Sequence, residues 1–472
     1  MKKPLSQGLT VLIPWISFFF CVSIWLFYLK IFYPGLISWD FYVQWHEMAG
    51  KIPLSDWHPV FHTLCMRLLT KVWFSPAMIS LSQIIFLATM VGMTVAGLLK
   101  YQIPRSIVIV VAMFFAFFPL HGFYSVSLCK DIAYSISYLW VTLLVMNIIV
   151  STGKVLKRKR NMIVFSVALF CLANIRHNGI LLAFGTLFVL FLFGYQENRK
   201  NLLIITVCLA CCIIFFKGSV FSYLDVNTKD KNVLKAHLPI QQIGEILNGD
   251  VELSEQESAF LAHILPLDYW KKAYNARTCM PLIFGRNREG KPYLNGDFLK
   301  ENQNYRYFLK IWLSLALQHP EAIMKYYIKS TELLWRVKVP YNVFVIADED
   351  LTEQDLFKEY QQSPKLSERT GNIGKKLINL INNKKTGWFL HRGAIYFWLS
   401  LLSIIVSVLR FRDIRILIIA APFLFQSFSV ALFPLVQDTR FVYPIILTAP
   451  IFAPLLFSPF FMKPLTTISN TT

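Results

Sequence analysis

The chain is 472 residues long, with 55% hydrophobic residues and only 16% charged residues. This apolar fraction exceeds what the core of a soluble domain requires, so the composition predicts a membrane protein. The net charge of +20 alone would suit a nucleic-acid partner, but no basic patch with interleaved aromatic residues accompanies it, and we expect no nucleic acid to bind.

Ten apolar runs predict an all-α polytopic membrane protein with about 10 transmembrane helices. The runs cover residues 11–32, 78–99, 104–118, 132–150, 162–173, 180–193, 202–216, 394–409, 414–433 and 441–461. The first has no small-residue cleavage site behind it, so we expect it to be retained as a helix. The fifth, sixth and seventh are short and require burial among neighbouring helices, or flanking side chains that reach the interface.

Basic residues gather in alternate connections between these runs, with five of them in the segment 154–160. Cytoplasmic loops of membrane proteins are enriched in Lys and Arg, so these connections are predicted to be cytoplasmic. An even number of spans then places both termini, which carry Lys2, Lys3 and Lys463, on the same side. We therefore expect a multi-pass protein of the plasma (inner) membrane with cytoplasmic N- and C-termini.

The spacing of the runs divides the chain into three parts. Residues 1–217 form a predicted N-terminal membrane core of about seven helices, and residues 393–472 form a C-terminal membrane segment of about three. Between helices 7 and 8, residues 218–392 are predicted to form a mainly helical extracytoplasmic region. Helices are expected there at 254–263 and at 305–337, the second broken or kinked by Pro320.

The predicted first outer loop, residues 34–77, contains the acidic residues Asp40, Glu47 and Asp56 soon after the first span. Carboxylates at a lipid–water boundary suit general-base work on an acceptor hydroxyl, so these three are the candidate catalytic residues. The loop also carries Trp39, Trp45 and Trp57. These fit the alternative of a solvated amphipathic loop whose aromatic residues belong to an interfacial belt.

Two histidines of the same loop raise the question of a metal. His58 and His62 are four residues apart, the spacing that places side chains on one helix face, and Asp56 lies close by as a third ligand. The glutamate of an H-E-x-x-H motif is absent, and Pro59 disfavours helical geometry at His58. The pattern is compatible with a divalent metal but predicts no metal site, so we expect the histidines to shape the site or contact an acceptor.

Charged and polar residues also gather at the predicted outer ends of later spans. They are Lys130 and Asp131, then Arg176, His177 and Asn178, and finally Asp438 and Arg440. Ionisable groups at this depth are costly unless they are paired or functional, and an Arg fork binds two phosphate oxygens together. The alternatives are snorkelling to the interface, a local pair of Lys130 with Asp131, and a local pair of Arg440 with Asp438.

Four segments carry a resemblance to a known group: "YPGLISWDFYVQWHEM", "FYSVSLCKD", "NIRHNG" and "QDTRFVYP". Together with the arrangement of the spans, they resemble bacterial multi-pass proteins of the glycosyltransferase C (GT-C) superfamily. The resemblance implies a GT-C-like fold and a sugar donor carried on polyprenyl phosphate. By position it implies that Asp40 is the catalytic acidic residue, with Glu47 or Asp56 as alternatives, although Phe41 follows Asp40 where some branches have a second acidic residue.

The function predicted on this basis is a membrane glycosyltransferase that moves a sugar from a polyprenyl-phosphate-linked donor to an extracytoplasmic glycan, lipid or protein acceptor. Lys130, Arg176 and Arg440 are expected to bind the phosphate of the donor lipid. The residues expected to shape the site or contact the acceptor are His58, His62, Asp131, His177, Asn178 and Asp438. The alternatives are a transporter or flippase of a lipid-linked glycan, and a polymerase or ligase of surface glycans.

Overall fold

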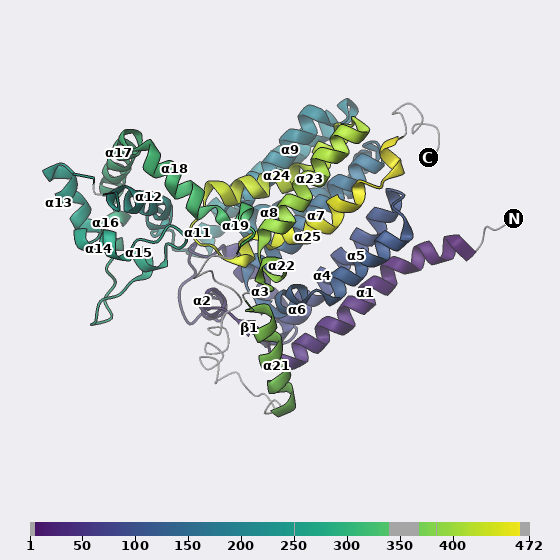
Figure 1. Ribbon diagram of the computed structural model, residues 1–472, viewed down its shortest axis with the longest axis horizontal. Coiled ribbons are helices and arrows are strands. Elements are labelled where there is room, and N and C mark those ends of the chain that lie inside the picture. The colour runs from purple at the N-terminus through teal and green to yellow at the C-terminus, as the bar shows by residue number, and fades with distance from the viewer. Residues whose placement is uncertain (1–4, 250, 339–367, 384, 463–472) are drawn as a thin grey trace.

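The computed structural model describes residues 5–249, 251–338, 368–383 and 385–462. A bundle of long helices forms the body of the molecule, and a smaller helical region, the outer region, projects from one end of it (Figure 1). The bundle contains α1 (Leu5–Ile31), α4 (Pro76–Lys100), α5 (Arg105–Phe117), α6 (Pro119–Val126), α7 (Lys130–Val150), α8 (Lys159–Ile175), α9 (Gly179–Phe193), α10 (Arg199–Phe215), α23 (Gly393–Phe411), α24 (Arg415–Leu432) and α25 (Thr439–Leu455).

Each of the ten apolar runs lies wholly or largely within one of these helices. In the described parts of the chain, six helices are long and apolar enough to cross a membrane, namely α1, α4, α7, α10, α23 and α24. The pair α5 and α6, bent by 51° at the break between them, counts as a seventh if it forms one span. The molecule is therefore mainly helical with several membrane-crossing helices, while the count of about 10 stays a prediction.

Some predicted boundaries are wrong. The connection between the third and fourth apolar runs, which the sequence does not mark as helical, forms a helix, α6, and a short strand, because Pro119 suits the first turn of a new helix. The last apolar run extends to residue 461, but α25 ends at Leu455, directly after Pro454. The expected helix at 305–337 is three helices, α17 (Asn302–Gln318), α18 (Pro320–Ser330) and α19 (Glu332–Trp335), with the first break at Pro320 as predicted.

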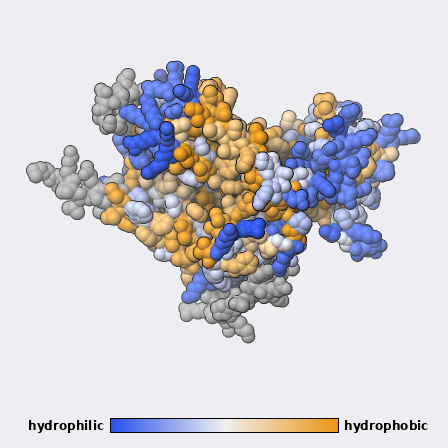
Figure 2. All heavy atoms as spheres, turned by 180° about the vertical axis from the view of Figure 1, so that it is seen from behind, coloured by the Kyte–Doolittle hydropathy of each residue, from blue (hydrophilic) through white to orange (hydrophobic). Residues whose placement is uncertain are grey.

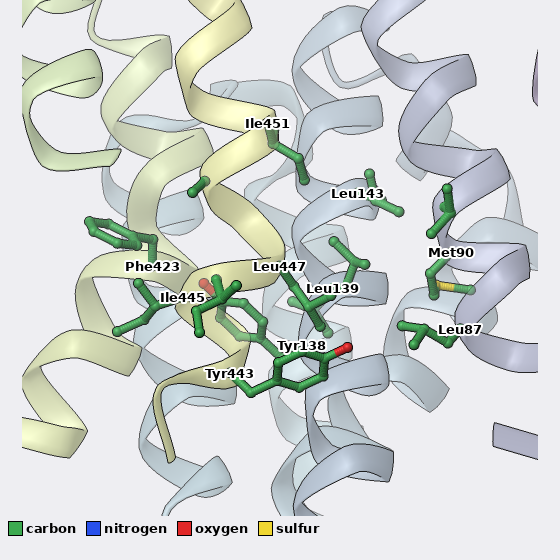
Figure 3. Close-up of a cluster of buried hydrophobic side chains, with 14 of the residues drawn as sticks. Leu87, Met90, Tyr138, Leu139, Leu143, Phe423, Tyr443, Ile445, Leu447 and Ile451 are labelled. Carbon is green, nitrogen blue, oxygen red and sulfur yellow. The ribbon is translucent and has the colours of Figure 1, made fainter. Parts of the chain in front are cut away.

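The bundle has a hydrophobic core and an apolar surface. Leu87, Tyr138, Tyr443 and Leu447 are fully buried where α4, α7 and α25 meet (Figure 3). On the outside, large apolar side chains are more than half exposed, among them Trp15, Val110, Ile163 and Ile214. Figure 2 shows this surface as an orange body between the hydrophilic outer region and a second hydrophilic cluster. Contiguous apolar surface of this kind suits contact with lipid.

The outer region has a hydrophobic core of its own, which includes Trp270 and Phe308. Its helices, besides α17 to α19, are α12 (Lys231–Leu247), α13 (Glu255–Ile264), α14 (Leu267–Ala273), α15 (Met280–Phe284) and α16 (Gly296–Lys300), whereas the short α11 (Phe221–Tyr223) ends the membrane-crossing segment that contains α10. The expected helix at 254–263 corresponds to α13, which Ser254 begins with a capping box to Glu257. Two further helices, α21 (Glu368–Ile381) and α22 (Gly387–Leu390), precede α23. Residues 339–367 of the predicted region lie outside the described residues.

The first outer loop forms a small element between α1 and α4. It contains a two-residue strand, β1 (Leu36–Ile37), and two helices, α2 (Trp39–Met48) and α3 (Val60–Leu69). The strand pairs in parallel with β2 (Ser127–Leu128), which directly precedes α7. This pairing joins the first outer loop to the end of a membrane helix that lies 90 residues later in the sequence.

Candidate functional site

The short β1–β2 pair fixes the centre of the site. Leu36 pairs with Ser127 and Ile37 with Leu128, so the chain leaves the two strands side by side and enters α2 and α7 together. Ser38 caps α2 by accepting a hydrogen bond from the Phe41 N–H, and its hydroxyl donates to the Leu128 carbonyl over 2.9 Å. Acidic and basic residues in the first turns of the two helices therefore lie next to each other.

Asp40 of α2 and Lys130 of α7 form the closest contact of the site. The Lys130 Nζ lies 2.5 Å from the Asp40 Oδ2 and 3.2 Å from the His58 Nδ1. Arg440, in the first turn of α25, places its guanidinium 3.3 Å from the same Asp40 oxygen. One carboxylate oxygen thus accepts hydrogen bonds from two cations that come from different membrane helices.

A second carboxylate, that of Asp131, contacts the basic residues of the site. Asp131 is buried, 3.0 Å from the Arg176 Nε and 3.6 Å from the Arg440 Nε. The predicted alternative of a Lys130–Asp131 pair is wrong, because adjacent residues on a helix point in different directions. The alternative of an Arg440–Asp438 pair is correct in part: the Arg440 Nε lies 2.8 Å from the Asp438 Oδ2, but Arg440 also reaches Asp40.

The charges of these neighbours set the protonation of Asp40 and His58. Burial opposes ionisation of Asp40, but Lys130 and Arg440 outweigh it and hold the pKa of this carboxyl well below its usual range. Burial, with Lys130 adding to it, lowers the pKa of His58 to about 3. At neutral pH, Asp40 is therefore an anion and His58 is a neutral hydrogen-bond partner for the Lys130 ammonium.

A second polar group lies between α2 and α3. The His62 Nδ1 lies 3.1 Å from the Gln44 side-chain oxygen, and the Gln44 amide donates to the Thr63 hydroxyl over 2.9 Å. Glu47 is 4% exposed; one of its carboxylate oxygens accepts from the Ser55 N–H, and the other has no hydrogen-bond partner among the described residues. Burial raises the pKa of Glu47 to about 7, so this carboxyl titrates near neutral pH.

The corner between α8 and α9 contributes two neutral groups. The His177 Nε2 lies 3.1 Å from the Asp56 carbonyl oxygen, and burial lowers the pKa of this imidazole. The Asn178 amide donates to the Ser429 hydroxyl of α24 over 2.7 Å. His177 and Asn178 therefore brace the corner that carries Arg176, whose guanidinium also stacks 4.4 Å from the centre of the Phe441 ring.

A cavity of about 1710 Å³ opens where the bundle meets the outer region. Ten of the twelve predicted site residues line it, and the remaining two, His62 and Asp131, are buried and outside its lining. The lining contains seven Lys or Arg residues against four Asp or Glu residues, so the cavity favours an anionic ligand. Its volume exceeds that of a typical small-molecule pocket and leaves room for two substrates.

A model of a family of unknown function, DUF6020, matches residues 53–458, which is most of the chain. The chain belongs to the DUF6020 family. No curated protein and no solved structure matches it. The matched part of this DUF6020 protein includes Lys130, Arg176 and Arg440 and begins after Asp40 and Glu47.

Three residues of the site carry side chains that can ligate a metal ion. The ligand atoms of Asp40, Cys129 and Asp131 all lie within 4.8 Å of one another. Both carboxylates are already paired with cations, so a divalent ion would lie among positive groups at a cost in Coulomb energy. The predicted histidine pair is divided, because α3 begins at Val60 and leaves His58 outside the helix. The cluster therefore fits an anion better than a metal.

Sequence reasoning missed two residues that shape the DUF6020 site. The Cys129 thiol lies 3.0 Å from the Asp131 Oδ2, and the buried Gln437 holds the turn between α24 and α25. The Gln437 backbone N–H donates to the Arg277 carbonyl and its side-chain amide donates to the Lys329 carbonyl. Gln437 lies within the "QDTRFVYP" segment, in which the sequence predicted roles for Asp438 and Arg440 only. Contacts with the outer region thus fix the turn that precedes Arg440.

Proposed function

We propose that this DUF6020 protein is a membrane glycosyltransferase that moves a sugar from a polyprenyl-phosphate-linked donor to an extracytoplasmic glycan, lipid or protein acceptor. The proposal includes a GT-C-like architecture with about 10 spans in the plasma membrane and cytoplasmic termini. One observation carries it: the Asp40 Oδ2 accepts from Lys130 over 2.5 Å and from Arg440 over 3.3 Å.

Two cations that converge on one carboxylate oxygen are also spaced to hold one phosphate oxygen. Both are donors of charge-assisted hydrogen bonds, and the Arg fork adds directional contacts that suit a phosphate. Arg176 lines the same cavity and is positioned by Asp131. The three basic groups lie in the first turns of α7 and α25 and in the corner before α9, so a donor whose lipid tail stays in the membrane can present its phosphate to them.

The chemistry follows from an exchange of partners. A phosphate that binds Lys130 and Arg440 takes over contacts that Asp40 holds in the free protein. Asp40 then loses the charges that lower its pKa and becomes a stronger base at the moment when the donor is bound. The acceptor hydroxyl oxygen bonds to the anomeric carbon while the bond from that carbon to the phosphate oxygen breaks. The hydroxyl proton passes to Asp40, and the lipid phosphate leaves with the electron pair, stabilised by the basic groups.

The test uses purified full-length protein in lipid nanodiscs. Binding of polyprenyl phosphate is measured first, and then transfer of labelled sugar from polyprenyl-phosphate donors to membrane and glycan acceptors. The proposal expects binding that Arg440→Ala weakens and transfer that Asp40→Asn lowers by at least about a hundredfold. Lipid-phosphate binding without transfer from any donor, together with movement of donor across the bilayer, would support a transporter or flippase instead. Failure of polyprenyl phosphate to bind would overturn the proposal.

A further inference from the structure

The wall of the cavity that the outer region supplies has a chemistry of its own. Four residues of α12 line it at the spacing of one helix face: Lys231, Leu234, Lys235 and Leu238. Arg286, after α15, also lines the cavity, and its guanidinium donates to the Gly290 carbonyl over 2.7 Å. Among the described residues, none of these three cations has an acidic partner, unlike Lys130 and Arg440 at the membrane end. Their positive charge is therefore available to a ligand.

A buried polar atom marks the same wall. His237 of α12 lines the cavity and is only 5% exposed, and its Nε2 has no hydrogen-bond partner among the described residues. Burial lowers the pKa of His237 to about 4, so the imidazole is neutral at physiological pH. A buried ring nitrogen without a hydrogen-bond partner destabilises the folded protein unless a ligand or a water molecule forms a hydrogen bond with it.

Two aromatic rings pack against the His237 ring. The Trp57 ring centre lies 5.6 Å from that of His237, and the Phe284 ring centre lies 6.2 Å from it. Trp57 belongs to the first outer loop, next to the predicted catalytic carboxylates, and both Trp57 and Phe284 line the cavity. An aromatic face supports the apolar face of a sugar ring, and a neutral imidazole exchanges hydrogen bonds with sugar hydroxyls.

We infer that the outer-region wall formed by Lys231, Lys235, His237 and Arg286 with Trp57 is a binding subsite for an anionic glycan acceptor. The role as acceptor rests on the proposed function, whereas the binding of an anionic glycan does not. The cations of this wall are separate from Lys130, Arg176 and Arg440, so the cavity has one set of basic groups for a donor phosphate and another for acidic groups on the acceptor. Two anionic ligands bound side by side would account for both the net positive lining and the large volume of the cavity.

The test measures glycan binding to the purified full-length protein with two probes of the same sugar backbone, trigalacturonate and its neutral methyl ester. Wild-type protein is expected to bind the acid more tightly, with a difference that shrinks as salt is added. Lys231→Gln/Lys235→Gln removes two charges from the wall and should weaken binding of the acid about three- to thirtyfold with little effect on the ester. The control pair Lys272→Gln/Lys310→Gln makes the same charge change at exposed positions outside the cavity lining.

A second variant tests the imidazole separately from the charges. His237→Phe keeps a ring but removes both nitrogens, so binding of the acid and of the ester should weaken by the same factor, about threefold or more. Equal affinity of wild-type protein for acid and ester, or equal behaviour of the lysine pair and its control, would overturn the inference. Polyprenyl phosphate binding to the same variants is expected to stay unchanged, so a failure here is distinguishable from a failure of the proposed transferase.

Discussion

Asp40→Asn is the most informative substitution, because the structure predicts opposite effects on binding and on transfer. Asn keeps the size of the side chain and removes the charge that Lys130 and Arg440 share. The exposed fractions of the three side chains are 13% for Lys130, 27% for Arg440 and 23% for Asp40, so solvent screens these contacts only in part. A charge-assisted hydrogen bond of this kind contributes about 1.5–3 kcal/mol.

A phosphate that enters the wild-type site must displace Asp40 from at least one of these contacts. Without that competition, polyprenyl phosphate should bind Asp40→Asn about ten- to a hundredfold more tightly than wild-type protein. Transfer should fall by at least about a hundredfold, since the variant lacks the general base. Tighter binding with slower transfer is a combination that simple misfolding does not produce.

The assay combines equilibrium binding of polyprenyl phosphate with single-turnover sugar transfer. Asp297→Asn removes an exposed acidic charge outside the cavity lining and is the matched control, with no expected change in either measurement. Unchanged or weaker binding by Asp40→Asn would refute the competition between Asp40 and phosphate. Unchanged transfer would move the base to Glu47 or Asp56.

The other predictions concern the phosphate contacts, pH, metal and topology. Arg440→Ala should weaken polyprenyl phosphate binding by about 1.5–3 kcal/mol and Arg440→Lys by less, because an ammonium cannot make a bidentate contact; titration calorimetry measures both. The pKa of Glu47 is about 7, above the usual 4.5, so the folded protein keeps a proton that the unfolded chain has lost. The free energy of unfolding should therefore fall as pH rises from 4.5 to 7, and Glu47→Gln should be more stable by up to about 3 kcal/mol in thermal denaturation at pH 8. Transfer should survive chelation, whereas stoichiometric divalent metal in purified protein, lost in His62→Ala, would contradict this. Reporters fused after Arg160 should score cytoplasmic and those after Lys51 extracytoplasmic; the reverse result would place the cavity on the wrong side.

The sequence by itself determined the long apolar helices. All ten apolar runs correspond to helices, because a long apolar run in lipid must satisfy its backbone hydrogen bonds internally and a helix does so locally. Position along the chain also identified the candidate charges, since ionisable groups collect at the ends of apolar helices. Ten of the twelve named residues line one cavity, although they were selected only by type and predicted depth.

The pairing of these charges depended on tertiary structure. Asp40 meets Lys130 because the β1–β2 pair aligns the starts of α2 and α7, and two-residue strands leave too short a pattern to predict their pairing. Arg440 joins them from 400 residues further along the chain, held by a turn that the outer region braces through Gln437. The sequence left a Lys130–Asp131 pair open as an alternative, whereas the fold gives each of the two residues a different partner.

The position of the outer-region wall of the cavity likewise depends on the tertiary structure alone. The spacing of Lys231 and Lys235 predicts a shared helix face, but nothing in the sequence places that face opposite a membrane-edge site. Helix formation depends on contacts between residues three and four apart, which a sequence displays directly. A site assembled from α2, α7, α12 and α25 depends on packing between segments that are distant in the chain, and only the folded structure fixes which of their side chains meet.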